Sequence, residues 1–452
     1  MKRITLLIVL LCMHVVLLMA QSKKPNILII LADDLGWGDL GYLGGTIKTP
    51  VIDQLAKDGI RLNRFYTAAV CSPTRAGLMT GRYPDRFGLR ETVIPPWSKF
   101  GVNTDETFLP EYLAKAGYKN RAIIGKWHLG HASLKYHPLH RGFTHFYGHL
   151  NGAIDYFTHK REGELDWHND FNSSYDEGYA TDLLADEAVK RIRQYSQEEN
   201  PFFMYLAFNA PHGPFQAKEE DLLKPRGEDD LKKQTYAAMV RSLDENIGKV
   251  LEILKTLNIE DNTIVLFFSD NGYAPDSPGS SGELKGSKFT EWEGGVRAPA
   301  IIKWPAKLKG GKTMEQVTGY VDVLPTLLDI AGITEAPENP LDGISIYPVL
   351  NGSKSGIQRD FYLGEGALVN SNWKLIEAGN NNSRMKLQTD VLFNISRDIG
   401  ERKDLKDTET TIYKDLKTKL ETYNSIKSSK QVPPYGQGRK GFVAPKEWKV
   451  KE

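Results

Sequence analysis

Cys71 is the residue whose surroundings point most directly to chemistry. It opens the segment Cys71-Ser72-Pro73-Thr74-Arg75. Proline is typical of the first turn of a helix, where its missing N–H leaves no bond unmade, so we expect Cys71 just ahead of a helix start. The guanidinium of Arg75 would then lie close by. Three roles are open to this thiol: a small buried apolar residue, an intermolecular disulfide, or a group kept for its reactivity.

The start of the chain predicts export. A positive segment, Met1-Lys2-Arg3, precedes the apolar run Ile4–Met19, and Ala20 offers a small residue for cleavage. This pattern is typical of a secretory signal peptide over residues 1–20, and the run is too short for a membrane span. The alternatives are an uncleaved anchor or a lipoprotein at Cys12, which a bulky leucine before it disfavours. We expect a periplasmic or secreted protein with no stable membrane span.

Composition narrows the class of protein. Once the leader with Cys12 is removed, Cys71 is the single cysteine, so no intramolecular disulfide is possible. The full chain holds 58 basic and 57 acidic residues, and loss of Lys2 and Arg3 leaves a net charge of about −1. Nucleic-acid binding requires a basic excess, so no nucleic-acid partner is expected. A chain of 452 residues can bury a large core.

Strand and helix patterns alternate through the first part of the sequence. Continuous apolar runs such as Asn26–Leu31 and Thr263–Ser269 are typical of strands buried on both faces. Such alternation predicts an α/β fold, with a large mostly parallel sheet sandwiched by helices. Further strands are expected at 118–124 and 202–208, and helices at 50–56, 104–117, 180–195, 231–257 and 322–331, the last capped by Asp322.

A different texture begins after about Leu350. Short strands at 361–363, 373–376 and 391–394, and a helix at 410–423, predict a smaller α+β subdomain. The tail after Pro433 is rich in Gly, Pro and Lys, and we expect an extended arm. The predicted division is a signal peptide at 1–20, a main domain at 21–350 and a C-terminal subdomain with an extended tail at 351–452.

Oxygen ligands follow two of the predicted strands directly. Asp33 and Asp34 come after the first strand, and Asp270 and Asn271 come after the Thr263–Ser269 strand. Ligands of open α/β sheets bind at the carboxyl ends of strands, so we expect these side chains to meet. Hard oxygen donors suit Ca²⁺ or Mg²⁺ rather than zinc, and three packed carboxylates would repel without a cation. The alternative, that each pair only caps a turn, is weakened because the two pairs match.

Cations and histidines follow the other strands. Lys126 and His128 come after the 118–124 strand, and His212 comes after the 202–208 strand. We expect them at the same sheet edge as the acidic pairs. Other closely spaced histidines could suggest zinc, but Gly, Pro and aromatic residues separate them. We interpret these as loop residues, some lining a substrate cleft: His131, His137, His140, His145 and His149.

These residues together resemble the formylglycine-dependent sulfatases of the alkaline-phosphatase-like superfamily. The segment from Cys71 to Arg75 matches the C-x-P-x-R signature of that family, which continues to Arg82. The resemblance runs from about Pro25 to Leu350 and implies the α/β fold of the superfamily, with 21–350 as its catalytic domain. Further similar motifs, in family order, are Asn26–Gly38, Gly125–Gly130, Ala210–His212, Ser269–Gly272, Lys288 and Trp292–Arg297.

The resemblance implies a modified residue and a metal. Cys71 would be oxidised to formylglycine by a separate maturation enzyme. The hydrated aldehyde would offer one hydroxyl as a metal-bound nucleophile toward sulfur and a second through which sulfate is expelled. The implied Ca²⁺ ligands are Asp33, Asp34, the modified Cys71, Asp270 and Asn271.

The resemblance also implies roles for the charged residues. Arg75 and Lys126 would bracket the nucleophile and the metal, and would supply positive charge where negative charge builds up. His128 would take a proton during sulfate release. His212 and Lys288 would bind sulfate and assist the leaving alcohol. The alternatives are a structural histidine at 212 and a surface salt bridge at Lys288.

Three functions are therefore open. The favoured one is an exported sulfatase acting on sulfated polysaccharides or oligosaccharides. A phosphonate monoester or phosphodiester hydrolase of the same superfamily is the nearest alternative. A sulfated-glycan binding protein that keeps an unmodified thiol at Cys71 is the alternative from another class. We also expect four residues between the motifs to line the carbohydrate cleft: Trp97, Tyr156, Trp167 and His168.

Overall fold

The structure is a computed structural model that describes residues 24–450, except 91, 223–226, 336 and 380–381. The predicted signal peptide at 1–20, with Cys12, lies outside the described residues. Among the residues described, no helix is both long and apolar enough to cross a membrane.

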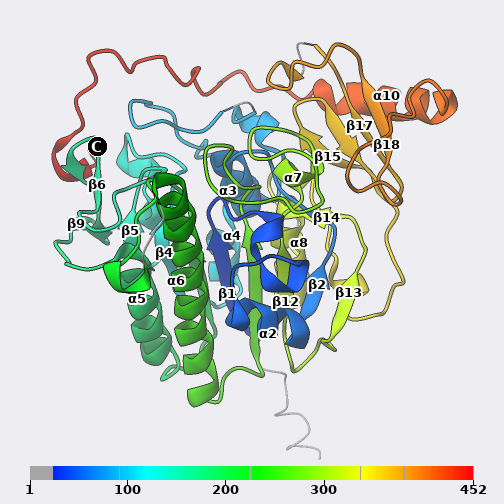
Figure 1. The fold of residues 1–452 in the computed structure, drawn as a ribbon. Helices are drawn as coiled ribbons and strands as arrows, with labels where there is room; N and C mark the ends of the chain where they lie inside the picture. Colours follow the sequence, from blue (N-terminus) through cyan, green and yellow to red (C-terminus); the bar gives the residue numbers. More distant parts are fainter. Residues whose placement is uncertain (1–23, 91, 223–226, 336, 380–381, 451–452) are drawn as a thin grey trace, which may run out of the picture.

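A ten-stranded sheet runs through the centre of the molecule (Figure 1). Its central strand, β1, pairs in parallel with β10 and β11, and β10, β4 and β5 continue the parallel part. Beyond β11 the sheet becomes mixed, because β12 is antiparallel to β11. In spatial order the strands are β13 (Lys312–Met314), β2 (Ile60–Leu62), β12 (Ala300–Lys303), β11 (Thr263–Ser269), β1 (Asn26–Ala32), β10 (Phe202–Ala207), β4 (Asn120–Lys126), β5 (His145–His149), β8 (His168–Asn169) and β9 (Asn172–Ser173).

Helices cover both faces of this sheet because its strands are apolar on both sides. Alternate residues of β1 enter different cores: Ile27 and Ile29 pack with one helix layer, and Leu28 and Ile30 pack with the other. The first layer holds α3 (Cys71–Thr80), α4 (Leu109–Lys115) and α8 (Val323–Ala331). The second layer holds α2 (Pro50–Asp58), α5 (Ala180–Tyr195) and α6 (Glu228–Thr256).

A smaller antiparallel sheet follows the main one in sequence. Its strands are β15 (Phe361–Gly364), β16 (Ala367–Val369), β17 (Trp373–Ile376) and β18 (Val391–Asn394), with α10 (Thr410–Asn424) packed on them. Its core includes Tyr66, Tyr83 and Tyr320 from the main part, so the two parts share apolar contacts. After α10 the chain returns as an extended arm along the main part toward β6 and β9 (Figure 1).

The remaining elements are short. They comprise β3 (Phe65–Tyr66) paired with β14 (Thr318–Gly319), β6 (Lys160–Arg161) paired with β7 (Glu164–Leu165), α7 (Glu293–Val296) and α9 (Tyr347–Leu350). Turns of 3₁₀ helix occur at Trp37–Asp39, Gly41–Leu43, Pro84–Phe87, Leu134–Tyr136, Pro138–His140, Glu219–Asp221, Tyr320–Asp322 and Lys446–Trp448.

The predicted fold class is confirmed, but several local predictions were wrong. The helix expected from 104 begins only at Leu109, because Pro110 fits a first turn and would break a helix interior. Asp322 precedes α8 as expected, yet its carboxylate accepts from Gly319 N and Ile344 N instead of capping the helix. His145 and His149, interpreted as loop residues, lie in β5.

Candidate active site

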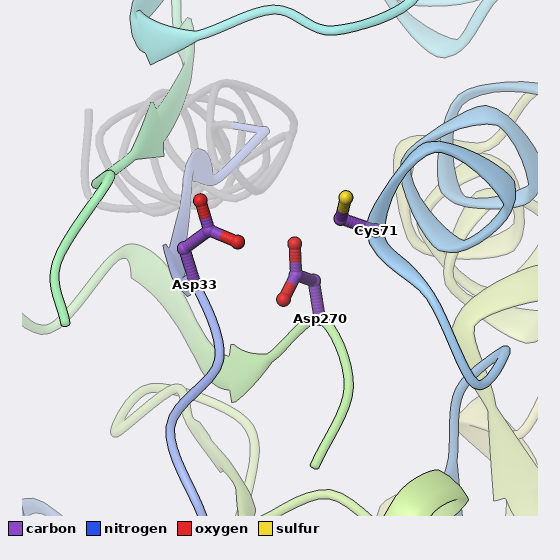
Figure 2. A group of neighbouring side chains, drawn as sticks. All are labelled: Asp33, Cys71 and Asp270. Atoms are coloured by element: carbon purple, nitrogen blue, oxygen red, sulfur yellow. The ribbon is translucent and has the colours of Figure 1, made fainter. Parts of the chain in front are cut away.

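The parallel strands carry the predicted site residues to one edge of the sheet. Asp33 and Asp34 follow β1, Asp270 and Asn271 follow β11, and Lys126 ends β4. The start of α3 brings Cys71 to the same edge, where it faces Asp33 and Asp270 (Figure 2). One sulfur atom and one oxygen from each carboxylate lie within 4.8 Å of one another. The edge predicted from the sequence is therefore where these side chains meet.

The surroundings of Cys71 favour the protonated thiol. It is the first residue of α3, a helix whose residues are all buried, and its Sγ lies 3.4 Å from Nδ1 of His128. Burial raises the pKa of the Cys71 thiol, and the nearby Lys126 only partly opposes this. An unmodified Cys71 is thus a poor nucleophile in this position, because the thiolate is the reactive form.

Arg75 connects the acidic residues on the Cys71 side of the cluster. Its Nε and Nη2 lie 3.0 and 2.8 Å from Oδ2 of Asp270, and its Nη1 donates to the carbonyl of Lys126 at 3.1 Å. The Lys126 Nζ lies 2.6 Å from Oδ2 of Asp33. Burial, with Asp270 close by, raises the pKa of Asp33 to about 7. Added positive charge would therefore favour the ionised form of Asp33.

Asp34 anchors the other side of the cluster. The Lys288 Nζ lies 2.7 and 2.8 Å from its two carboxylate oxygens, and Nε2 of His212 lies 3.6 Å from Oδ2. Burial would raise the pKa of Asp34, but Lys288 and His212 hold it well below its usual range. Burial lowers the pKa of His212, which favours a neutral ring near pH 7. The structure thus places Lys288 and His212 with the acidic residues, as the sequence predicted.

The donor set fits a hard divalent cation. Among the described residues, Oδ1 of Asp33 and Oδ1 of Asn271 are buried and have no hydrogen-bond partner. Asn271 donates through Nδ2 to Asp34 Oδ1 at 2.7 Å, so its oxygen is the atom left over. Unpaired buried oxygens are costly, and Ca²⁺ takes such carboxylate and amide oxygens. Arg75, Lys126 and Lys288 balance the three aspartates, so a bound Ca²⁺ would make the cluster positive.

His128 is fixed by its surroundings. It has a left-handed backbone with φ 58°, an uncommon conformation for a non-glycine residue. Its Nε2 lies 3.0 Å from the carbonyl oxygen of Ile94, and Ser72 links both segments by donating to His128 O and accepting from Ile94 N. A Cβ at Gly152 would lie 2.6 Å from Nε2, so only glycine leaves room for the ring. Burial and the charge of Lys126 lower the pKa of His128, which leaves it able to accept a proton.

The predicted aromatic lining of the cleft was wrong. Trp167 and His168 are core residues with 0% and 3% exposure, and His168 pairs with Asp166. Trp97 is 8% exposed because the C-terminal arm covers it. Tyr156 is 1% exposed and has a different function, described next. Aromatic side chains gain stability by burying a large apolar area, and these rings are buried in the protein and do not line a cleft.

The sequence interpretation missed Asn209 and placed Tyr156 in the cleft instead of behind the loop of His212. The Tyr156 hydroxyl lies 2.6 Å from the carbonyl of Asn209 and 2.8 Å from that of His212, which places the loop that carries His212. Asn209 is 2% exposed, and neither polar atom of its side chain has a partner among the described residues. Its position directly after the 202–208 strand was the available signal, since the other strand-end residues were found in this way.

Comparison with known proteins identifies the family. The sequence model of the sulfatase family, described as "Sulfatase", matches residues 25–333. The chain belongs to the sulfatase family. It is 37% identical to human N-acetylgalactosamine-6-sulfatase over 73% of this chain and 66% of that protein. It is 31% identical to mouse arylsulfatase J over 92% of this chain and 78% of that protein.

Solved structures place this sulfatase-family chain in the alkaline-phosphatase-like superfamily. The structure is similar to that of Ps i-CgsB, with a TM-score of 0.79 and 33% identity over 89% of this chain and 93% of that one. Ps i-CgsB has also been solved in complex with k-i-k-neocarrahexaose. The matched region spans about two thirds of the length of the curated N-acetylgalactosamine-6-sulfatases.

Proposed function

We propose that this protein is an exported, Ca²⁺-dependent hydrolase of sulfate esters on polysaccharides or oligosaccharides. The observation that carries the proposal is Cys71 at the start of α3, facing Asp33 and Asp270 within 4.8 Å. The unpartnered oxygens of Asp33 and Asn271 supply hard donors beside it. The similarity of this chain to human N-acetylgalactosamine-6-sulfatase, and to Ps i-CgsB with its bound k-i-k-neocarrahexaose, supports a sulfated sugar as the substrate.

Cys71 is the proposed site of conversion to formylglycine by a maturation enzyme. A soft, protonated thiol is poorly matched to a cluster of oxygen donors, which supports the conversion. When present, the hydrated aldehyde supplies an oxygen nucleophile and a route for expelling sulfate. Asp33, Asp34, Asp270 and Asn271 hold Ca²⁺ in this proposal, and that ion supplies Lewis acidity.

The neighbouring cations stabilise charge in the proposed reaction. Arg75 and Lys126 are buried and bonded to the aspartates, so their charges are fixed in place before substrate arrives. Fixed charges in a water-poor site stabilise developing negative charge more strongly than mobile ones. His128 accepts a proton from the group at position 71 as sulfate leaves, and its Nδ1 lies 3.4 Å from that side chain.

His212 and Lys288 act on the substrate side. The His212 side chain is 24% exposed, more than the other members of the cluster, so it borders the opening. In the proposal the negative charges of Asp34 and of the bound sulfate favour the protonated form of His212, which hydrogen-bonds the sulfate and donates a proton to the leaving alcohol, while Lys288 binds a sulfate oxygen. Because Lys288 also pairs with Asp34, its ammonium is held in place.

Export and domain division complete the proposal. Residues 1–20 act as the signal peptide, 21–350 form the catalytic domain, and 351–452 form the C-terminal subdomain with its tail. Export places the protein outside the cytoplasm, in the periplasm or medium, where polymeric substrates are available. Maturation of Cys71 then requires a separate enzyme that acts on the chain.

The test measures the modification of Cys71 and compares the turnover of sulfate and phosphonate esters. The protein is produced together with a formylglycine-generating enzyme, and the mass of the Cys71 peptide is measured. We expect the aldehyde mass and faster turnover of an aryl sulfate than of an aryl phosphonate. Faster phosphonate turnover would instead support the phosphonate hydrolase. An unmodified thiol with glycan binding and no sulfate release would support the binding protein.

A further inference from the structure

Residues 427–450 form a segment that we name the C-terminal strap. It leaves the end of α10 and runs across the main part of the molecule to the β6 and β9 region (Figure 1). Most of its residues are exposed, and its one regular element is the 3₁₀ turn Lys446–Trp448. An extended segment of this length stays on the protein surface only if specific contacts fix it there.

The strap is anchored at both ends and in the middle. Near its start, the backbone N–H of Val432 donates to the carbonyl of Gly88 at 2.8 Å. In the middle, the indole of Trp97 donates to the carbonyl of Tyr435 at 2.7 Å. At its end, Trp448 is 1% exposed and donates through Nε1 to Arg161 O at 2.9 Å. These contacts keep the strap on the body of the protein.

The middle anchor is connected to the active site through residues 94–97. Trp97 ends the segment 94–97, whose first residue, Ile94, accepts from Nε2 of His128 at 3.0 Å. His131 holds the same segment, since its Nε2 lies 2.9 Å from Pro96 O. Residues 94–97 therefore contact His128, which lies beside the Cys71 side chain, and also contact the strap. The strap is therefore connected to His128 through Trp97 and Ile94.

The strap is rich in unpaired positive charge. Its single acidic residue is Glu447, which pairs with Lys449 at 2.9 Å. The other five cations are exposed and make no ion pair within the part of the chain that the structure describes: Lys427, Lys430, Arg439, Lys440 and Lys446. Arg439 stacks above Trp97, 5.1 Å from the ring centroid, which places one of these charges at the middle anchor. The net charge of the whole chain is only +1, so this concentration is local.

We infer that the strap is a binding subsite for a polyanionic glycan chain, whose further sulfate groups it engages while one ester occupies the active site. This rests on the proposed function and adds a preference for long, multiply sulfated substrates. The half-exposed ring of Tyr435 lies between the cations of the strap and can pack against a sugar face. A row of like charges beside a site for the opposite charge raises the local concentration of a polyanion.

The test removes charge from the strap without touching the catalytic cluster. The variant K430Q/R439Q/K440Q is compared with wild type on an aryl sulfate and on sulfated oligosaccharides from disaccharide to octasaccharide. We expect kcat/KM for the octasaccharide to fall about tenfold while that for the aryl sulfate is unchanged. In wild type, the advantage of the octasaccharide should disappear at about 1 M salt, where the screening length is about 3 Å.

A matched control removes the same charge from the opposite edge of the sheet. K57Q/R193Q/K307Q alters three exposed cations near the end of α2, the end of α5 and the loop after β12. We expect this variant to keep the preference for long substrates. An unchanged preference in the strap variant, or an equal loss in the control, would overturn the inference. Equal losses on the aryl sulfate and the octasaccharide would also overturn it.

Binding separates this inference from the proposed function. Calorimetric titration of the octasaccharide into Cys71→Ser protein measures affinity without turnover. A loss of about tenfold in affinity when the three strap charges are removed supports the strap, even if wild type releases no sulfate from any substrate. An unchanged affinity overturns the strap inference, whatever the turnover shows.

Discussion

The molecule contains two buried clusters of lysine and carboxylate side chains, which differ in how many of their oxygens are paired. Lys288 in one cluster and Glu293 in the other are only five residues apart in the chain. Lys288 belongs to the catalytic cluster through Asp34. Glu293 belongs to a second cluster, in which Lys374 of β17 lies 2.9 Å from Glu293 and 2.9 Å from Glu401. The second cluster joins α7 to the C-terminal sheet, so it links the loop that carries Lys288 to the smaller part of the molecule.

The two clusters differ in the partners of their buried oxygens. In the second cluster, Glu293 is fully buried, and its two oxygens are paired with Lys374, Arg297 and Tyr66. In the catalytic cluster, Oδ1 of Asp33 and Oδ1 of Asn271 have no hydrogen-bond partner among the described residues, and the Arg75 guanidinium lies 3.7 Å from that Asp33 oxygen. Similar residue types therefore give a structural link whose shared lysine lies 2.9 Å from both glutamates, and a candidate reaction centre where oxygen ligand atoms are spare.

The sharpest test of the comparison is Cys71→Ala. We expect kcat to fall by about 10⁴-fold or more, because the proposed nucleophile derives from this side chain. The fold should persist, since the change removes one small buried group. Sulfate release and thermal unfolding are measured on the same preparation. Retained turnover would contradict the formylglycine mechanism.

Asp270→Asn tests the metal. We expect turnover to fall by about 10²-fold or more, and the stabilisation of the folded protein by added Ca²⁺ to be lost, because the charged ligand is gone. The stabilisation by Ca²⁺ is measured as the difference in thermal unfolding temperature with and without a chelator. Asp244→Asn is the control, since Asp244 is buried but accepts from Val51 N and Ile52 N at the start of α2. It should lose stability and keep the response to Ca²⁺.

His212→Ala tests the leaving-group side of the catalytic cluster. Alkyl sulfates, whose alcohols leave poorly, should lose about 10²-fold in kcat/KM, and an activated aryl sulfate about tenfold or less. The measurement is a plot of rate against the pKa of the leaving alcohol. A steeper slope in the variant is expected. The same slope as wild type would exclude proton donation by His212.

Lys374→Met tests the structural cluster. Removing the lysine leaves Glu293 and Glu401 buried without their partner, which we expect to cost about 3–5 kcal/mol of unfolding free energy. The response to Ca²⁺ should survive in the folded fraction. Lys417→Met is the matched control, because Lys417 bridges Glu377 and Asp390 at 25% exposure and should cost about 1 kcal/mol or less. A Lys374 variant that keeps its stability but loses Ca²⁺ binding would make the two clusters one functional unit.

The main fold could be predicted because its local signals are strong. The apolar run of β11 and the amphipathic pattern of α5 have the bounds expected from the sequence, Thr263–Ser269 and Ala180–Tyr195. Short elements gave weaker signals, so β16 (Ala367–Val369) was missed. Strand-end residues such as Asp33 and Asp270 could be placed together because parallel strands end at one edge of a sheet.

Other features depend on contacts between distant segments, which no local pattern records. Glu293 opens the short helix α7 and Lys374 lies in β17, and only the packing of the C-terminal sheet against the main part makes them a buried pair. The sequence predicts Trp97 in a sugar cleft, but Tyr435, far along the chain, covers its ring.

The amino-acid sequence by itself determined the family, the order of the main strands and helices, and the residue types gathered at the carboxyl edge of the sheet, since these follow from periodicity and motif spacing. Only the tertiary structure decided which oxygens stay unpaired, which charges are neutralised and where the strap lies. The physical reason is that burial and partnership are properties of segments brought together from far apart, such as Asp34 and Lys288.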